Sequence, residues 1–352
     1  MDARLSDCQW HHNHHPQISG RGHLGGLRNV GQFVTEKRLM RFVPLFLWLS
    51  LCSVALVAQT RIQIINYNVE NFFHPGNDTG SVSTGNEFTP EGIRHWTYER
   101  YKEKLAHIGQ VVANIGEWHT PALVGLEEVE NEQCLLDLCK FGVLRNYRYR
   151  YLHRDSKDVR GIDCALLYHP GQFCLLHHTF ISVPTEGRPT RDIVYASGLL
   201  QNGDTLHVFL CHFPSRRGTA ETDSRRMAAQ QTLQTRLDSL LLQNPMSRIV
   251  VMGDFNAAPS EQFNPLHNLM IDFENRAEGT YRWHGVWSCL DHFYVTANLL
   301  PYIQTGIYSP DWLLEDDLQY LGKKPFRTYQ GYKYTGGYSD HLPVWMTITL
   351  PQ

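Results

Sequence analysis

Apolar residues follow two different patterns along the chain, and together these predict a protein of mixed helices and strands. The segment 61–69 and the continuous apolar runs 122–126 and 248–252 are typical of buried strands. From Tyr98 to Ile115, apolar side chains recur at alternating intervals of three and four residues, which predicts an amphipathic helix. Further helices are expected at 132–139 and 220–242, and closing strands at 290–296 and 342–350.

The middle of the chain is rich in strand patterns. Strands are expected at 147–152, 162–168, 171–180, 192–200 and 206–211, and the dipeptide Asn202-Gly203 indicates a hairpin turn between the last two. No repeat and no long linker interrupts residues 61–352, so we expect a single domain. Meandering strands with helices between them favour an α+β fold, in which two sheets pack face to face with helices outside.

The first 58 residues differ from the rest. Residues 1–39 are rich in Gly and His and have no apolar periodicity, which predicts a disordered leader. If synthesis starts at Met40, this leader is not translated. The sequence KRLMR then precedes a 17-residue apolar run, 42–58, that ends in small residues, as in a secretory signal peptide. We therefore expect a cleaved signal at 40–58 and an exported domain at 59–352, periplasmic or secreted. A membrane anchor is the alternative, since this run is close to the shortest span.

Charge and cysteine content narrow the functional classes. The net charge is −3, and removal of residues 1–58 takes away six Lys/Arg and three Asp/Glu, which leaves −6. A polyanionic substrate would therefore have to be attracted by local cationic groups or by metal ions. Six cysteines follow residue 58, too few for a disulfide scaffold, so pairing of some and burial as free thiols both stay open. We expect a monomer that does not insert in a membrane after signal cleavage.

Polar residues gather where the expected strands begin or end. Asn68 follows the first strand, Glu128 the second, and Asp254 follows the run 248–252, while Asp340 and His341 precede the last strand. Acidic groups directly after apolar strands are costly to hold there unless a cation or a partner compensates. Each alone also suits a turn or a cap, but four such clusters in one chain indicate a site.

These clusters resemble motifs of the endonuclease/exonuclease/phosphatase superfamily of metal-dependent phosphoesterases, which includes DNase I-like nucleases, neutral sphingomyelinases and inositol polyphosphate phosphatases. The motifs occur in order as NYNVENF, GLEEVEN, RGIDCALLY, CHFPSRRG, GDFNAAPS, LDHFYV and YSDHLPV, over about residues 62–349. The resemblance implies the DNase I-like fold, a four-layered α/β sandwich of two mixed β-sheets with helices outside. It also implies Mg²⁺ as the cofactor, with Mn²⁺ or Ca²⁺ as alternatives.

The resemblance assigns roles to the residues of these motifs. Glu128 would hold the metal with support from Asn68 and Asp340, and Asp254 and Asn256 would orient the attacking water and hold a phosphate oxygen. His341 would lie at the scissile phosphate, and Arg191 would contact the phosphate. His212 would be a second catalytic histidine, paired with the carboxylate of Asp163 and therefore protonated. Asp291 would lie near the metal-binding edge.

The same family spans nucleic acids, lipids and soluble phosphates, so the fold does not choose the substrate. Arg216 and Arg217 follow His212 and could track a phosphate backbone, which favours an exported nuclease-type phosphodiesterase. A sphingomyelinase-like enzyme or a small-molecule phosphatase is the alternative, and a binding protein on the same fold is a third. The sequence departs from the family at Glu127, where a Gln is usual, so the site is expected to be more anionic or to take a second metal.

Overall fold

The computed structural model describes residues 59–76, 87–215, 220–259 and 263–351. The predicted leader, the signal peptide, Arg216 and Arg217 lie outside these residues. Within them the chain forms two six-stranded sheets, as expected. The first has the order β13 (Ile303–Ile307), β18 (Val344–Pro351), β1 (Gln59–Phe72), β2 (Leu123–Val129), β4 (Asp163–Tyr168) and β3 (Arg150–His153). The second has the order β5 (Cys174–Ile181), β6 (Ile193–Leu199), β7 (Thr205–His212), β8 (Arg248–Asp254), β12 (Asp291–Val295) and β9 (His267–Asn268).

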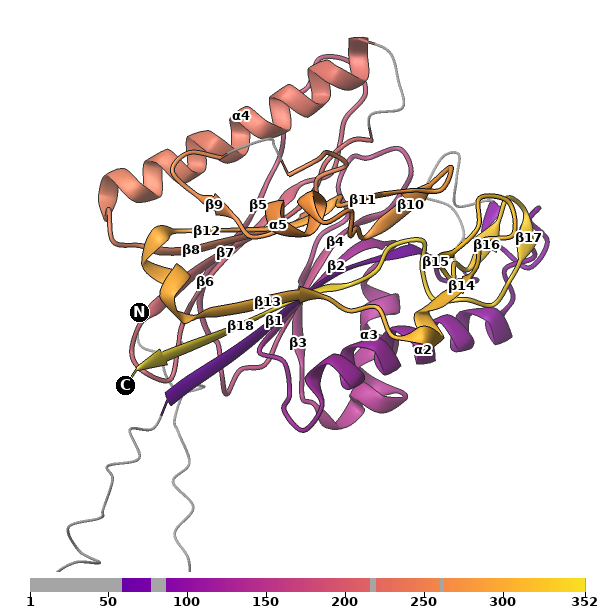
Figure 1. Cartoon of the computed structure of the whole chain (residues 1–352), viewed down its shortest axis with the longest axis horizontal. Helices are drawn as coiled ribbons and strands as arrows, with labels where there is room; N and C mark the ends of the chain where they lie inside the picture. The colour runs from indigo at the N-terminus through magenta and orange to yellow at the C-terminus, as the bar shows by residue number, and fades with distance from the viewer. Residues whose placement is uncertain (1–58, 77–86, 216–219, 260–262, 352) are drawn as a thin grey trace, which may run out of the picture.

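Helices lie on the outer faces of these sheets, with α4 along one side of the strands and α2 and α3 along the opposite side (Figure 1). The α-helices are α2 (Tyr98–Gly116), α3 (Glu132–Lys140), α4 (Ala220–Gln243) and α5 (Ile271–Asn275). The 3₁₀ helices are η4 (Val143–Asn146), η5 (Ala297–Tyr302) and η6 (Asp311–Leu313). The three longest α-helices were all expected from the sequence, and α2 begins after Thr97, whose side chain accepts a hydrogen bond from the Arg100 backbone N–H.

Three apolar cores separate the four layers. One lies against α2 and α3 and contains Ile108 and Tyr67, a second lies between the two sheets and contains Ile64, and a third contains Leu237 of α4. Strand β1 contributes to two of them, because successive side chains of a strand point to opposite faces. Both faces of β1 therefore carry buried apolar side chains, which explains why apolar and polar residues do not alternate strictly in its sequence. The four-layered sandwich is confirmed.

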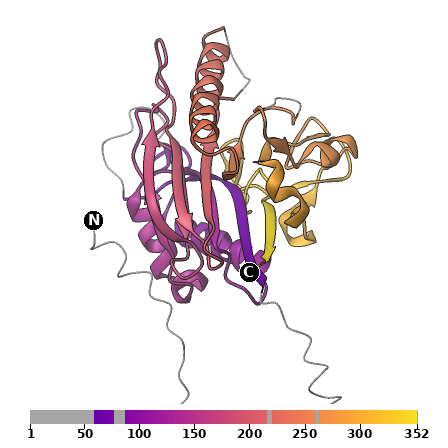
Figure 2. The same cartoon turned by 90° about the vertical axis from the view of Figure 1, so that its left-hand side faces the viewer.

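Small hairpins collect at one end of the sandwich. They pair β10 (Tyr281–Trp283) with β11 (Val286–Ser288), β14 (Leu314–Asp316) with β15 (Lys323–Pro325), and β16 (Tyr329–Gln330) with β17 (Lys333–Tyr334). Figure 2 shows these orange-to-yellow segments together on one side of the strands. The start of β1 and the end of β18 lie at the far end, where Gln59 pairs with Pro351. The hairpins thus rise at the end of the sheets opposite the chain termini.

Two further expectations can be compared with the structure. The Asn202-Gly203 turn joins the antiparallel strands β6 and β7, and Gly203 adopts a φ of 84°, as the hairpin prediction requires. The free-thiol interpretation holds for five cysteines, Cys134, Cys139, Cys164, Cys211 and Cys289. In the described part of the chain, no helix combines the length and apolar character needed to span a membrane.

Candidate active site

The carboxyl ends of the central strands bring the predicted residues to one edge. Strands β7 and β8 run parallel, so His212 lies beside Asp254, and Asp291 of β12 pairs with Asp254 from the other side. In the first sheet β1 and β2 are also parallel, which puts Asn68 beside Glu127 at their carboxyl ends. Asn68 Nδ2 donates to Asp254 Oδ2 at 3.0 Å, and this bond joins the ends of the two sheets.

Asp254 is the centre of the site. Its Oδ1 accepts from the Asn256 backbone N–H at 2.8 Å, and its Oδ2 accepts from Asn256 Nδ2 at 3.3 Å as well as from Asn68. Two histidines approach the same Oδ2, with Nε2 of His212 at 3.6 Å and Nε2 of His341 at 3.8 Å. Five polar groups therefore converge on one buried carboxylate. Asn256 adopts a φ of 49° in the turn that allows both of its contacts.

Charges around Asp254 fix the protonation of His341. Burial alone would lower the pKa of His341, but the carboxylates of Asp291 and Asp254 outweigh it and hold that pKa well above its ordinary value. Nδ1 of His341 lies 2.8 Å from Asp291 Oδ2, so the imidazolium donates to that carboxylate. Burial, with Asp291 adding to it, raises the pKa of Asp254 to about 7. His341 is thus a positive group beside a carboxylate that titrates near neutrality.

The prediction for His212 and Asp163 was wrong. Burial, with the charges of Arg191 and Arg160 adding to it, lowers the pKa of His212 well below its ordinary value, so this imidazole is neutral. Its carboxylate neighbour is Asp254, while Asp163 accepts from the Ser156 backbone N–H. Asp163 is the first residue of β4, and its neighbour Cys164 packs into the core between the sheets. Because successive side chains of a strand point to opposite faces, Asp163 points away from that core.

Glu128 occupies the end of β2 in a strained backbone conformation. Its φ is 67°, which non-glycine residues rarely adopt, and such strain collects at functional sites. Oε2 of Glu128 accepts from the Asn71 backbone N–H at 2.9 Å, and its Oε1 accepts from Arg160 at 3.2 Å. Asp340 lies at the same end of the cleft and accepts from Arg327 at 2.6 Å. The oxygen atoms of Glu128, Asp340 and Asn68 are the hard donors that a divalent cation of the Mg²⁺ type takes.

A buried charge network beneath Asp340 was missed from the sequence. Lys104 of α2 is 1% exposed, and its Nζ donates to Thr328 Oγ1 at 2.6 Å. The charges of Glu70, Asp340 and Glu128 raise the pKa of Lys104, but burial outweighs them and lowers it to about 8. Lys104 follows Tyr101 by three residues and therefore lies on the apolar face of α2. A lysine on the apolar face of a predicted helix was the sequence signal that could have revealed this buried charge network.

Most of the predicted residues line one cleft of about 770 Å³. Its lining includes Asn68, Glu128, Arg191, His212, Asp254, Asn256, Asp340 and His341. Asp163 and Asp291 are not among the lining residues, and Asp291 acts instead from behind His341. Arg160, Arg188, Arg225 and Arg327 add positive charge to the walls. Arg191 is 5% exposed, and its guanidinium lies 3.8 Å from Asp158.

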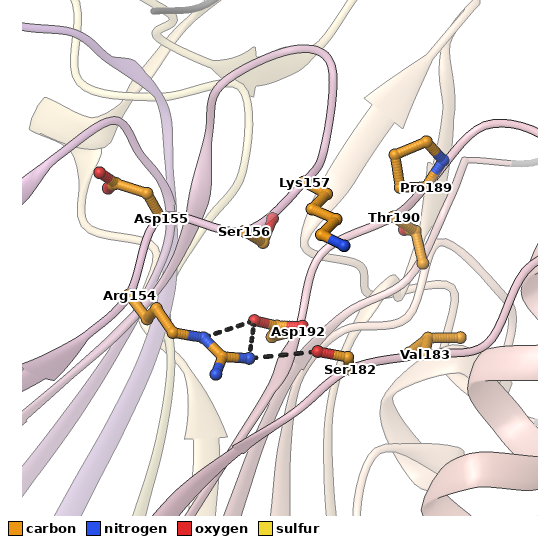
Figure 3. A pocket seen from close by; sticks show the side chains of 9 residues that line it. All are labelled: Arg154, Asp155, Ser156, Lys157, Ser182, Val183, Pro189, Thr190 and Asp192. Atoms are coloured by element: carbon orange, nitrogen blue, oxygen red, sulfur yellow. Dashed lines mark hydrogen bonds and ion pairs between the residues drawn. The ribbon is translucent and has the colours of Figure 1, made fainter.

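A group of possible metal ligands and a smaller cavity also lie outside the metal site assigned to Glu128. Ligand atoms of Asp254, Asp291 and His341 lie within 4.8 Å of one another, as a metal site would require, but the hydrogen bond to Asp291 already occupies one nitrogen of the imidazole. A smaller cavity of about 280 Å³ lies between the loop that follows β3 and the loop that precedes β6. Arg154 and Asp192 form an ion pair on its wall, so its main charges neutralise each other (Figure 3).

Glu127 is the acidic residue that departs from the family, and its burial opposes the extra negative charge that was expected there. It is fully buried, and its pKa is raised well above the ordinary value by burial and by Asp291 and Asp254. A second metal at Glu127 stays a prediction.

Comparisons with known proteins identify the family and the fold of the chain. The sequence model described as the endonuclease/exonuclease/phosphatase family matches residues 63–350. No curated protein sequence matches the chain. Among solved structures, truncated TDP2 of Caenorhabditis elegans is 16% identical with a TM-score of 0.53, and covers 82% of this chain and 97% of its own. The human Nocturnin catalytic domain with bound sulfate is 16% identical with a TM-score of 0.51, and covers 84% and 96%. TDP2 of D. rerio complexed with a single-strand DNA product is 15% identical with a TM-score of 0.52, and covers 82% and 98%.

Proposed function

Because the chain belongs to the endonuclease/exonuclease/phosphatase family, whose members hydrolyse phosphoester bonds with the help of a metal ion, we propose that it is a Mg²⁺-dependent phosphodiesterase of nuclease type. The observation that carries the proposal is the convergence of Asn68, Asn256, His212 and His341 on the carboxylate of Asp254. Such an arrangement can activate a water beside a phosphorus atom and place a positive charge on the oxygen atoms around it.

In this mechanism Asp254 orients the attacking water and accepts its proton. A pKa of about 7 suits a general base at neutral pH, because the group is then both available and basic enough. The amide of Asn256 donates to Asp254 Oδ2 and restricts the direction of that oxygen. His212 also approaches Asp254 Oδ2, and because its imidazole is neutral it adds a polar contact there without a second positive charge.

His341 has the complementary role. Its Nδ1 is held by Asp291, which leaves Nε2 directed to the Asp254 side of the cleft. The imidazolium can stabilise negative charge on a non-bridging phosphate oxygen or donate a proton to the leaving oxygen. Asp291 is therefore a positioning residue, in the way that a buried carboxylate orients a catalytic imidazole.

Glu128, with Asp340 and Asn68, would hold the divalent cation. Bound there, the cation would polarise a phosphoryl oxygen and neutralise the charge that develops on it. The donors are oxygens alone, which favours Mg²⁺, with Mn²⁺ or Ca²⁺ as alternatives. Arg160 and Arg327 offset part of the negative charge of these carboxylates, since each forms an ion pair with one of them.

The cleft walls favour a nucleic acid as the substrate. Arg188, Arg191 and Arg225 line one region of the cleft and can contact phosphates beside the scissile one. Trp283 of β10 also lines the cleft, is 48% exposed, and stacks on His284 at 4.6 Å between ring centroids. An indole that is half exposed on a cleft wall is the kind of side chain that contacts nucleobases. The D. rerio TDP2 complex with a single-strand DNA product supports this choice by analogy of fold.

The proposal also includes export of the protein. The apolar run 42–58 after a basic segment supports a cleaved signal and a periplasmic or secreted domain that acts as a monomer.

The test compares substrates with the same protein preparation. Supercoiled plasmid, single-stranded DNA, RNA, sphingomyelin and bis-(p-nitrophenyl) phosphate are each incubated with Mg²⁺, with Mn²⁺ and with EDTA, and His341→Ala is the control variant. Metal-dependent plasmid nicking or DNA cleavage that His341→Ala loses is the expected result. Turnover of sphingomyelin or of the synthetic ester with nucleic acid untouched would overturn the nuclease assignment and keep the phosphodiesterase.

A further inference from the structure

A second group of metal-ligating side chains lies outside the catalytic cleft. The loop 154–162 leaves β3 after His153 and enters β4 at Asp163. His153, Asp155 and Asp163 each offer one ligand atom, and these three atoms lie within 4.8 Å of one another. None of the three residues lines the cleft that contains Asp254.

Two of these side chains are buried with unpaired polar atoms. The side chain of His153 is 3% exposed, and its Nε2 has no hydrogen-bond partner among the described residues. Asp163 is also 3% exposed, and the same holds for its Oδ1. A buried polar atom without a hydrogen-bond partner is destabilising, so these two side chains call for a partner that the described chain does not provide. A cation is the partner that a nitrogen and a carboxylate oxygen share.

Asp155 is the third member of the group. The side chain of Asp155 is 77% exposed and can move, and its Oδ1 lies 3.8 Å from His153 Nδ1. In a tetrahedral zinc site, bonds of about 2.0–2.2 Å put neighbouring ligand atoms roughly 3.3–3.6 Å apart. The 3.8 Å between Asp155 Oδ1 and His153 Nδ1 is close to this spacing.

We propose that His153, Asp155 and Asp163 form a second cation site, separate from the catalytic cleft, that takes a divalent transition metal of the Zn²⁺ type. One imidazole with two carboxylates is a donor set for zinc, whereas Mg²⁺ takes oxygen ligands. Asp155 also lines the smaller cavity beside Arg154 and Asp192, so the proposed site borders that cavity (Figure 3).

The site would hold a loop that reaches the catalytic cleft. Asp163 Oδ2 accepts from the Ser156 backbone N–H at 3.0 Å, and Ser156 Oγ accepts from the Asp158 N–H at 3.1 Å. Asp158 Oδ1 in turn accepts from the Arg160 N–H at 2.9 Å, and the guanidinium of Arg160 bonds Glu128. A cation on Asp163 therefore acts structurally, by ordering the segment that presents Arg160 to the cleft.

The test is a Zn²⁺ titration of the full chain by isothermal calorimetry, repeated with Co²⁺ by visible absorption. We expect Asp155→Asn and His153→Gln each to lose one bound equivalent or to weaken it at least tenfold, and to lose the absorption of four-coordinate Co²⁺. Asp291→Asn and Glu128→Gln should keep that equivalent, because Glu128 lines the catalytic cleft and Asp291 lies behind His341. His207→Gln, a half-buried imidazole bonded to Tyr195, is the matched control.

Asp155→Asn carries the test, since Asp155 is exposed and its replacement leaves the core intact. A Zn²⁺ titration of Asp155→Asn and His153→Gln that is superimposable on the wild type would overturn the proposal. Loss of the equivalent only in Asp291→Asn would also overturn it, because the cation would then belong to the catalytic cleft.

Discussion

Replacing Asp291 by asparagine removes the carboxylate to which His341 Nδ1 donates at 2.8 Å. A hydrogen bond between charged groups contributes about 1.5–3 kcal/mol, and Asp254 Oδ2, 3.8 Å from the other ring nitrogen, stays in place. The pKa of His341 should therefore fall in this variant. If the imidazolium is the active form, kcat/KM above neutral pH should fall about 10–100-fold, and the loss should shrink as the pH is lowered.

The assay is hydrolysis of bis-(p-nitrophenyl) phosphate at saturating Mg²⁺ from pH 5.5 to 9.5. The alkaline limb of the profile reports the loss of the His341 proton, and it should move to lower pH in Asp291→Asn. Asp192→Asn, which removes a carboxylate paired with Arg154 outside the cleft, should leave the limb where it is. An unchanged limb in Asp291→Asn would refute the role given to this pair.

Stability gives an independent view of the same contact. Because the pKa of His341 is raised in the folded state, the pair stabilises the fold fully below the ordinary histidine pKa and loses this effect as pH rises through the raised value. Urea unfolding should therefore show a larger cost of Asp291→Asn at pH 5.5 than at pH 9.5.

Three further changes have defined outcomes. Glu128→Gln should weaken Mg²⁺ binding at least about tenfold in calorimetry, and unchanged affinity would place the ion elsewhere. Gly253→Ala should destabilise the fold by about 1–3 kcal/mol in urea unfolding, because a Cβ there would lie 1.9 Å from the Cys211 carbonyl oxygen at a φ of 150°; wild-type stability would contradict this. Asp163→Asn should flatten the pH dependence of stability in metal-free protein, where burial raises the pKa of Asp163 from 3.8 to about 6 and the wild type loses about 3 kcal/mol in all as pH rises from below 3.8 to above 6; an equally steep loss in the variant would contradict it.

The elements that the sequence predicted best are those whose apolar pattern is long. Helices α2 and α4 and strands β1 and β8 were found within a few residues of their expected bounds, because each packs a whole apolar face or run into a core. The hairpins of two or three residues, such as β16 with β17, were missed. Segments this short contain too few positions for a period to emerge, and side-chain contacts with the sandwich hold them instead.

The residues of the candidate site could likewise be predicted only in part from the sequence. Asp254 and Glu128 could be predicted to meet, since both end strands that run parallel within their sheets. The partner of His341 could not, because Asp291 is 50 residues away and its approach depends on the register of β12 against β8. Asp163 was misassigned for a related reason: its motif lies at a strand end like the others, but the alternation of β4 turns its side chain away from the core between the sheets.

The measurement that tests the central claim most directly is the Mg²⁺-dependent hydrolysis of bis-(p-nitrophenyl) phosphate by the wild type and by Asp254→Asn. Asparagine keeps the shape of the side chain and removes the base on which Asn68, Asn256 and both histidines converge. The account predicts activity that EDTA abolishes, that Mg²⁺ restores, and that falls at least about 100-fold in Asp254→Asn. Metal-dependent turnover by Asp254→Asn at the wild-type rate would contradict it.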